Sequence, residues 1–381
     1  MATATMTTKT HPALRIHARE KLQLDNIPSL PCGPNEVRLK IAYCGICGSD
    51  IHEYQALPIF APPPGGKHHA TGVELPVVMG HEMSGTVTEV GSAVRDLEPG
   101  QNVAVCPSLD DRSYNEPPCS SCRRGKVNIC KRFATYGLSA WGGGFSTEIV
   151  VKDFNCFPLP SSVSLKVGAL TEPLAVAWHS IRTSGFQKGQ TALILGAGPI
   201  GLAILLLLKV WDASKVVVTE VTEARQLQAQ KFGADLVINP LRKPAGSSSE
   251  VPADPVVDAI RTFSEDGVDV AFDATGLQST LDTALAATRP GGTIFNVAIH
   301  EKPLSLNLND IGFLEKRLLG GICYTKEDYE QVINAMESGK IPFEQMITSV
   351  VPLTNAIEGG FMELIRNKAK HVKILIQPEK D

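Results

Sequence analysis

The sequence has little excess charge of either sign and little uninterrupted hydrophobicity. Its 36 Lys and Arg residues against 40 Asp and Glu residues leave a net charge of −4. This balance does not indicate the excess of positive charge that binds nucleic acid or an anionic membrane. One stretch of 19 uncharged residues, 190–208, approaches a membrane-spanning length, but glycines and a proline interrupt it. We therefore interpret it as a buried strand, turn and helix, and expect a soluble protein without nucleic-acid or membrane partners.

We recognise no secretory signal, and the nine cysteines cannot all be paired because their number is odd. Cysteines in a reducing compartment serve metal or redox chemistry more often than disulfides. We therefore expect a cytoplasmic protein. The 381 residues, with 43% hydrophobic and 20% charged residues, are typical of a globular protein and sufficient for two domains.

The chain changes character twice along its length. Residues 1–172 are rich in Gly and Pro and hold short alternating runs, which predict antiparallel β-structure, with a first strand over Ala13–Leu24. Residues 173–324 alternate strand-like and helix-like segments, which predicts a parallel sheet covered on both faces, interrupted by a polar surface loop at Asn239–Pro255. Residues 325–381 are too few for a domain and are expected to pack back on the N-terminal part.

A glycine-rich turn follows an apolar strand and precedes a helix near residue 196. In the pattern G-x-G-x-x-G, the first glycine permits a tight turn, the second lets a pyrophosphate approach and the third lets helix and strand pack closely. The helix N-terminus supplies N–H groups to the phosphate. The sequence therefore predicts a dinucleotide site at this turn, formed by Gly196, Gly198, Pro199, Ile200 and Gly201.

An acidic residue, Glu220, closes the next predicted strand. A carboxylate there accepts hydrogen bonds from the adenosine ribose and repels a 2′-phosphate, which favours NAD(H) over NADP(H). Arg225 lies nearby, and its role has two alternatives. Its cation either binds the 2′-phosphate of NADP(H) or covers the adenine ring.

Three cysteines in a polar, basic loop have the spacing of a structural zinc site: Cys119, Cys122 and Cys130. A closed tetrahedral site needs a fourth ligand. Glu116, three residues before the first cysteine, and Cys106 are the candidates, and three free thiols without a metal are the alternative.

A second set of metal-ligating residues is dispersed along the chain: Cys47, His81, Glu82 and Glu172. Each alone has a structural explanation. Together, ahead of a dinucleotide fold, they are what a catalytic zinc requires, namely three protein ligands and one open position.

These motifs occur in the order found in the zinc-dependent medium-chain alcohol and polyol dehydrogenases, and the sequence resembles that family along nearly its whole length. The motifs are Gly45–Asp50, Gly80–Gly85, Cys119–Cys130, Glu172–Leu174 and Gly196–Gly201. Within the family the sequence looks most like the fungal 2,3-butanediol dehydrogenases, at His52–Tyr54, Pro58–Phe60, Gly143–Phe145 and Trp178–His179. Sorbitol and xylitol dehydrogenases share the Glu-Pro-Leu element and are the nearest alternative.

The resemblance implies an α/β architecture in which a doubly wound Rossmann domain is inserted into a β-rich, GroES-like catalytic domain. It implies the oxidation of a vicinal diol or secondary alcohol to a ketone with Zn²⁺ and NAD(H), and we expect a homo-oligomer, a dimer or a tetramer. The motif match implies that Cys47 and His81 ligate the catalytic zinc and that Glu82 and Glu172 are each a ligand or a neighbour through water. Asp50 matches the acid that orients the zinc-bound histidine.

The resemblance also implies that Ser49 and His52 form a proton relay. A protein that only binds a dinucleotide has no use for such a relay, so these residues favour an enzyme over a binding module. One departure from the family is evident: Glu116 stands where relatives begin the structural zinc site with a cysteine.

Overall fold

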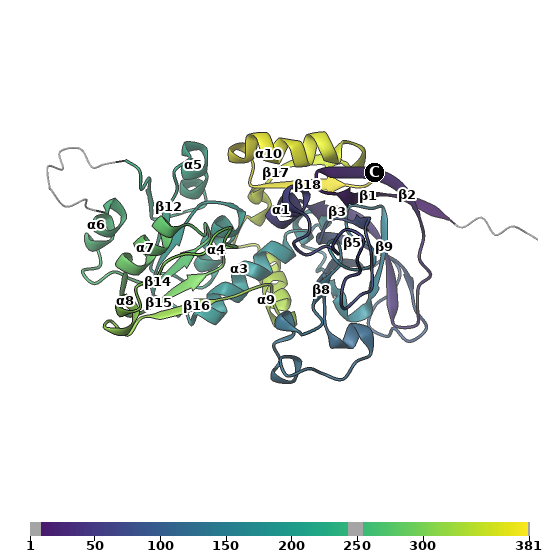
Figure 1. Cartoon of the computed structure of the whole chain (residues 1–381), viewed down its shortest axis with the longest axis horizontal. Coiled ribbons are helices and arrows are strands. Elements are labelled where there is room, and N and C mark those ends of the chain that lie inside the picture. Colours follow the sequence, from purple (N-terminus) through teal and green to yellow (C-terminus); the bar gives the residue numbers. More distant parts are fainter. Residues whose placement is uncertain (1–8, 243–253, 380–381) are drawn as a thin grey trace, which may run out of the picture. The chain divides into compact units, whose positions relative to one another are not determined.

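The computed structural model describes residues 9–242 and 254–379, so part of the expected loop at Asn239–Pro255 lies outside the described residues. The chain folds into two compact units (Figure 1). One unit contains the described residues up to Glu172 and from Thr325 onward, and the other contains Pro173–Tyr324.

A largely antiparallel sheet in the order β10-β6-β5-β3-β18-β17, with β9 paired to β3, forms the centre of the first unit. In this sheet Leu375 of β18 lies opposite Gly45 of β3, so the C-terminal strand is paired with an N-terminal one, and Figure 1 shows the yellow strand beside the purple ones. The C-terminal strand is thus part of this sheet. The strands are β3 (Glu36–Gly45), β5 (Glu82–Val90), β6 (Asn102–Val105), β9 (Glu148–Lys152), β10 (Cys156–Pro158), β17 (Ile347–Pro352) and β18 (Lys373–Gln377).

The N-terminal segment is a hairpin, and the single strand expected over Ala13–Leu24 is wrong. The chain reverses at Glu20, whose φ of 57° is in the left-handed region. The sequence there has neither Asn-Gly nor Asp-Gly, the pairs that usually mark a two-residue hairpin turn. The hairpin pairs with a third short strand, and a separate two-stranded sheet is formed by strands that precede and follow the loop of Cys119–Cys130 in the sequence. These strands are β1 (Thr10–Ala18), β2 (Lys21–Pro28), β4 (Val77–Val78), β7 (Ser108–Leu109) and β8 (Ala134–Thr135).

Short helices surround the sheets of the first unit. Its core is apolar and includes edge-to-face contacts of Phe361 with both Tyr54 and Phe145. The α-helices are α1 (Gly48–Ala56), α2 (Leu165–Gly168), α9 (Lys326–Glu337) and α10 (Glu363–Asn367), and α3 (Thr171–Ser184) begins here. The tighter turns are η1 (Asp111–Tyr114), η2 (Cys122–Arg124), η3 (Val127–Ile129), η4 (Asp153–Asn155), η5 (Phe343–Met346), η6 (Leu353–Asn355), η8 (Lys368–Lys370) and the wider π-helical η7 (Ala356–Met362).

The second unit is built on a six-stranded, fully parallel sheet in the order β13-β12-β11-β14-β15-β16. Its central strands are runs of apolar residues because both faces are covered. The strands are β11 (Thr191–Leu195), β12 (Lys215–Thr219), β13 (Leu236–Ile238), β14 (Val268–Asp273), β15 (Thr288–Asn296) and β16 (Arg317–Gly320).

Alternate residues of β11 face different helices. Leu193 and Leu195 belong to a buried cluster with residues of α6 and α7, whereas Ile194 lies against Gly201 of α4. Helices therefore cover both faces of the sheet, as Figure 1 shows, and the expected doubly wound α/β class is confirmed. The helices of this unit, beside the rest of α3, are α4 (Pro199–Val210), α5 (Glu223–Lys231), α6 (Pro255–Arg261), α7 (Gln278–Ala287) and α8 (Asn309–Gly312).

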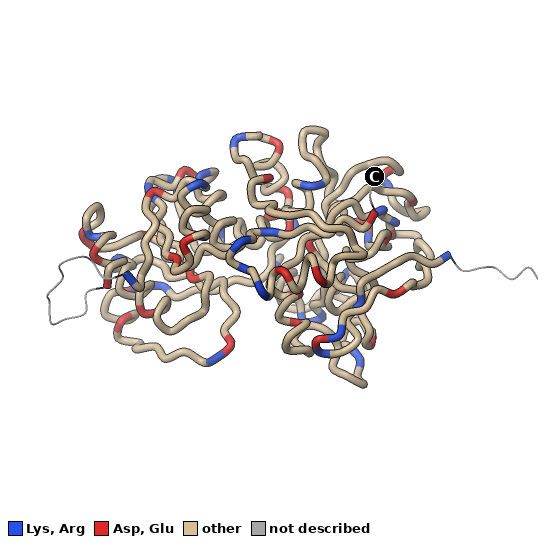
Figure 2. The backbone as a smooth tube through the Cα atoms, turned by 90° about the horizontal axis from the view of Figure 1, so that it is seen from above, with Lys and Arg blue, Asp and Glu red and all other residues tan. Residues whose placement is uncertain are grey.

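Charged residues of both signs are interspersed along the described chain in Figure 2, in keeping with the small net charge. Over the same residues, none of the helices combines the length and the apolar composition that crossing a membrane requires.

Candidate active site

The first cluster of functional residues begins at the N-terminus of α1. Cys47 directly precedes the helix, and its backbone N–H donates to Asp50 Oδ2 at 2.9 Å. An acidic side chain in the first turn satisfies a backbone N–H that has no partner within the helix and interacts favourably with the helix dipole. Asp50 is fully buried, so this contact fixes both the helix start and the position of the Cys47 thiol.

His81 comes to the same place from the segment that precedes β5. Its Nδ1 lies 3.5 Å from Asp50 Oδ1, and its Nε2 lies 3.2 Å from the hydroxyl oxygen of Ser49. Burial by itself lowers the pKa of His81, but the negative charge of Asp50 and the contact with Cys47 outweigh burial, so the pKa lies well above its usual value. In the metal-free chain this arrangement stabilises the protonated imidazole.

Glu82 is the neighbour of His81 at the start of β5 and is fully buried. Its Oε1 accepts a hydrogen bond of 2.6 Å from the Lys373 ammonium group, which also donates to the carbonyl oxygen of Ile46 at 3.1 Å. Burial lowers the pKa of Lys373, but the charges of Glu82 and Cys47 more than compensate and raise it. Gly45 is required beside them, because a Cβ atom there would lie 2.0 Å from Glu82 Oε2.

The structure brings three of the four dispersed residues together, since the ligand atoms of Cys47, His81 and Glu82 lie within 4.8 Å of one another. Within the described residues, Asp50 Oδ1, His81 Nδ1 and Glu82 Oε2 are buried yet make no hydrogen bond. Glu172, near the start of α3, is buried and contributes to the raised pKa of Lys373, but it is not a member of this group.

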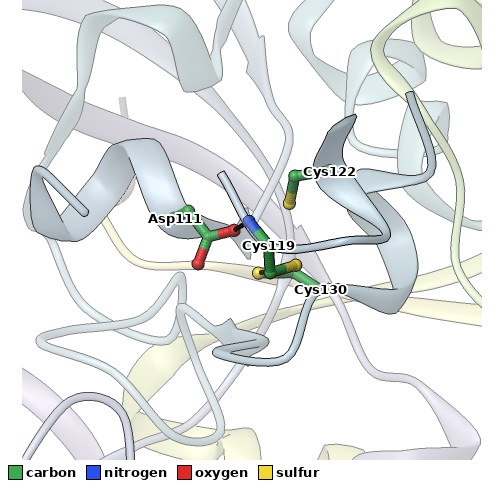
Figure 3. A group of neighbouring side chains, drawn as sticks. All are labelled: Asp111, Cys119, Cys122 and Cys130. Atoms are coloured by element: carbon green, nitrogen blue, oxygen red, sulfur yellow. Dashed lines mark hydrogen bonds between the residues drawn. The ribbon is translucent and has the colours of Figure 1, made fainter. Parts of the chain in front are cut away.

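A second cluster joins the three cysteines of the loop to an acidic residue that the sequence did not single out. Asp111, the first residue of η1, lies with Cys119, Cys122 and Cys130, and Figure 3 shows their side chains directed toward one another. Asp111 Oδ2 accepts the backbone N–H of Cys119 at 2.7 Å, and the sulfurs of Cys119 and Cys130 are 3.9 Å apart. The hydrogen bond from the Cys119 backbone is the largest cause of the lowered pKa of Asp111.

Neither expected fourth ligand belongs to this second cluster. The side chain of Glu116 is 45% exposed and its Oε2 accepts a hydrogen bond of 3.0 Å from Arg132. Cys106 lies outside the group as well, and burial raises the pKa of its thiol to about 12.

In the second unit, the glycine-rich turn has the geometry that each glycine position requires. Gly196 has a φ of 99°, which few residues other than glycine adopt. A Cβ atom at Gly201 would lie 2.0 Å from the Gly196 carbonyl oxygen, so only glycine permits this contact between helix and strand. Gly198, at the N-cap of α4, has nothing within 4 Å of its would-be Cβ, which leaves its backbone open to a ligand.

Glu220 follows β12 and holds the glycine-rich turn. Its Oε2 accepts the backbone N–H of Ala197 at 3.0 Å, and its Oε1 accepts that of Thr222 at 2.8 Å. The side chain is buried, and Arg225 lies two residues into α5 and is half-buried. The acid that the sequence assigned to the ribose therefore also supports the turn expected to bind the pyrophosphate.

Three structurally important residues escaped the sequence argument. Asp111 precedes Cys119 by eight residues, outside the spacing used for zinc ligands, and its signal is the unusual pair Asp110-Asp111. Lys373 stands at the start of an otherwise apolar strand, which is itself a signal for a buried partner. Glu53, fully buried in α1, accepts the backbone N–H groups of Ile59 and Phe60 at 2.9 and 2.7 Å and anchors the loop after the helix.

Comparisons with known proteins agree with this fold. The profile of the alcohol dehydrogenase GroES-like domain matches residues 33–161, and that of the zinc-binding dehydrogenases matches residues 199–338. The chain is 40% identical over 359 residues to (R,R)-butanediol dehydrogenase of Saccharomyces cerevisiae, covering 90% of this chain and 91% of that protein. The chain belongs to the zinc-binding alcohol dehydrogenase family.

This dehydrogenase also resembles more distant members. It is 32% identical over 365 residues to the probable D-xylulose reductase A of Emericella nidulans, covering 94% of this chain and 93% of that protein. Among solved structures, 2R,3R-butanediol dehydrogenase of Bacillus subtilis superimposes with a TM-score of 0.87 at 34% identity, covering 97% of this chain and all of that one. The dehydrogenase is an oxidoreductase that acts on CH–OH groups, and its family implies Zn²⁺ and a nicotinamide cofactor.

Proposed function

We propose that this dehydrogenase catalyses the reversible oxidation of 2,3-butanediol to acetoin, or of a closely similar vicinal diol or secondary alcohol, with NAD. The observation that carries the proposal is the group of Cys47, His81 and Glu82 beside the Ser49 hydroxyl, in a chain 40% identical to a butanediol dehydrogenase. In the reaction, a hydride leaves the carbinol carbon for the nicotinamide ring, the hydroxyl proton goes to solvent, and a ketone remains.

The donor atoms of this group fit a zinc ion. A thiolate, an imidazole and a carboxylate are the ligand types of catalytic zinc, and three protein ligands leave a position open. The buried Oε2 atom of Glu82, which makes no hydrogen bond among the described residues, is further support, because buried polar atoms are normally paired. Zinc bound here supplies Lewis acidity that polarises the alcohol oxygen and eases loss of its proton. Glu172 is a further acidic residue proposed for the same site, where it contacts the zinc ion either directly or through a water molecule.

The chain's own residues position the site and move the proton. Asp50 holds the Cys47 backbone and the His81 ring and thereby orients both ligands. Ser49 is in contact with His81, and His52 is exposed three residues later on the same helix, so both side chains lie on one side of α1. We infer that Ser49 accepts the alcohol proton while its own hydroxyl proton moves on toward His52, which releases a proton to water.

The preference for NAD rests on Glu220. A buried carboxylate at the end of β12 keeps acceptor capacity beyond its two backbone contacts and repels a 2′-phosphate. The open backbone of Gly198, with Pro199 and Ile200 in the first turn of α4, is available to the pyrophosphate. Arg225 is expected to lie against the adenosine.

Cys119, Cys122 and Cys130 are proposed to hold a second zinc ion with a structural role. Their grouped sulfurs in a short loop support this assignment. None of the nine cysteines is in a disulfide bond, which supports a reducing, cytoplasmic location.

A homo-oligomer is supported by the edge of the second unit's sheet. β16 is the last strand of that sheet, and an edge strand presents unpaired backbone groups. Large apolar side chains are exposed on and around it: Leu308, Phe313, Leu314, Leu318, Leu319 and Ile322. We propose that a second copy of the chain covers this edge, and sedimentation of the wild type against Phe313→Asp tests it.

A polyol dehydrogenase is the second candidate, favoured by the 32% identity to a D-xylulose reductase. The deciding experiment is a panel of the 2,3-butanediol stereoisomers, acetoin, sorbitol and xylitol with NAD and NADP, followed at 340 nm. The proposal predicts the highest kcat/KM for one butanediol stereoisomer with NAD. A higher value for sorbitol or xylitol would assign the enzyme to the polyol group.

A further inference from the structure

We propose that Asp111 is the fourth ligand of the second metal site, so that three thiolates and one aspartate hold the zinc ion. This inference rests on the proposed zinc at Cys119, Cys122 and Cys130, and it replaces Glu116 as the residue that closes the tetrahedron. The class of ligand is a divalent cation of borderline softness, because a set of three sulfurs and one oxygen suits zinc.

The position of Asp111 is fixed from two sides. The backbone of Asp111 starts η1, whose N-cap is Asp110. The Asp110 side chain accepts the backbone N–H of Arg112, and the Asp110 backbone N–H donates to the Ser113 hydroxyl oxygen. The Asp111 side chain is 1% exposed and reaches the backbone N–H of Cys119. The two adjacent acids thus have separate tasks, since Asp110 holds the turn and Asp111 enters the cysteine group, as Figure 3 shows.

A carboxylate buried to this extent requires compensation for its charge. Arg132 Nη1 donates to Asp111 Oδ1 at 2.6 Å, and the Cys119 N–H occupies one acceptor position of Oδ2. Because each carboxylate oxygen accepts two contacts, each still has one position for a metal ion. Asp111 has a donor atom within 4.8 Å of the ligand atoms of all three cysteines.

Arg132 also explains why Glu116 stays outside the site. Its Nη2 donates to Glu116 Oε2 at 3.0 Å, so one guanidinium group holds Asp111 with one nitrogen and Glu116 with the other. The Glu116 side chain is 45% exposed, whereas that of Asp111 is buried. The geometry therefore gives the inner carboxylate the role of ligand and the outer one the role of neutralising Arg132.

The charge of the loop supports the same assignment. Three thiolates and one carboxylate around Zn²⁺ leave an excess of two negative charges. The loop itself supplies cations to offset them, namely Arg123, Arg124, Lys126, Lys131 and Arg132. Cationic neighbours also favour the thiolate forms that bind metal.

The experiment compares zinc content and zinc retention in the intact enzyme and in two matched charge-removing variants, Asp111→Asn and Glu116→Gln. The zinc content per chain is measured after purification, and retention is measured as the rate of release to a chromogenic chelator. We expect two zinc ions per chain in the wild type and in Glu116→Gln. Asp111→Asn is expected to bind the second zinc at least about 100-fold more weakly, since even outer contacts to a metal ligand contribute 10–100-fold.

A third variant, Asp111→Cys, separates a ligand from a merely structural acid, because it restores a donor but not the contact with Arg132. It is expected to keep two zinc ions, and after replacement with Co²⁺ its sulfur-to-cobalt absorption exceeds that of the wild type. The inference is overturned if Glu116→Gln loses the zinc that Asp111→Asn retains, or if Asp111→Cys binds no second metal. A wild type with a single zinc, removed by Cys47→Ala but not by Cys122→Ser, would instead refute the proposed second site.

Discussion

The ammonium group of Lys373 in β18 donates a hydrogen bond of 2.6 Å to Glu82 in β5, and both side chains are almost completely buried. The contact joins the last strand of the chain to the proposed catalytic metal cluster across 291 residues of sequence. It supplies the positive charge that a buried carboxylate requires.

Lys373→Met therefore removes the cation that is hydrogen-bonded to Glu82. We expect the metal-free protein to lose about 3–5 kcal/mol of unfolding free energy, the range for breaking a buried ion pair. Urea unfolding of chelator-treated protein measures the loss. The double variant Lys373→Met/Glu82→Gln is the control and should recover part of it, because no unpaired charge remains. Equal stability of the wild type and Lys373→Met would contradict this role.

The glycine-rich turn offers a matched pair of substitutions with different consequences. Gly201→Ala is expected to destabilise the fold by about 1–3 kcal/mol, because the new Cβ meets the Gly196 carbonyl oxygen. Gly198→Ala meets nothing within 4 Å and should change stability by less than about 0.5 kcal/mol. It should nevertheless weaken NADH binding about 10-fold or more, because the backbone must approach the pyrophosphate. Thermal unfolding and NADH fluorescence titration measure both effects, and unaltered NADH affinity in Gly198→Ala would contradict the placement of the pyrophosphate.

Glu220→Gln tests the preference for NAD. Removing the charge lowers the repulsion of a 2′-phosphate, so the ratio of kcat/KM for NAD to that for NADP is expected to fall about 10-fold, or 1.4 kcal/mol. The exposed Glu223 in the first turn of α5 provides a control, Glu223→Gln, which should leave the ratio unchanged. An unaltered ratio of kcat/KM for NAD to that for NADP in Glu220→Gln would contradict the proposal that Glu220 repels the 2′-phosphate.

Asp269 gives the second unit a dependence on pH. Burial raises its pKa, but hydrogen bonds from the Thr191 N–H and hydroxyl and from Arg289 outweigh burial and lower it. A carboxyl group with a lowered pKa in the folded state stabilises above its unfolded pKa of about 4 and loses that contribution as the pH falls through the folded value.

Asp269→Asn should therefore cost about 1.5–3 kcal/mol at pH 7, the value of a hydrogen bond to a charged group. The difference from the wild type should narrow as the pH is lowered below about 4. Urea midpoints between pH 7 and pH 3 measure it, with the exposed Asp266→Asn as the control. A stability difference between the wild type and Asp269→Asn that widens at low pH would contradict the lowered pKa of Asp269.

The two sheets and their order along the chain were predictable because local patterns carry them. Alternating and continuous apolar runs distinguish antiparallel from parallel strands, and Gly196 and Gly201 mark a turn whose geometry requires glycine. The hairpin turn at Glu20 was missed because a residue other than glycine, asparagine or aspartate adopts the left-handed conformation there.

The clusters were predictable only as far as spacing defines them. Cys119, Cys122 and Cys130 were expected to lie together and do, but spacing offered Glu116 and Cys106 as the fourth residue and did not suggest Asp111. The choice depends on the turn η1 and on how Arg132 holds the two acids, and both are properties of the folded chain. Lys373 could not be paired with Glu82 from sequence, since only the pairing of β18 with β3 brings it there.

The central claim is that this dehydrogenase oxidises a diol at a zinc ion held by Cys47, His81 and Glu82. The most direct test measures NAD reduction by 2,3-butanediol together with zinc content in the wild type and Cys47→Ala. We expect Cys47→Ala to lack one zinc ion per chain and to lose at least about 1,000-fold in kcat, since metal catalysis contributes several kcal/mol. Full turnover by a Cys47→Ala enzyme that lacks this zinc would contradict the account.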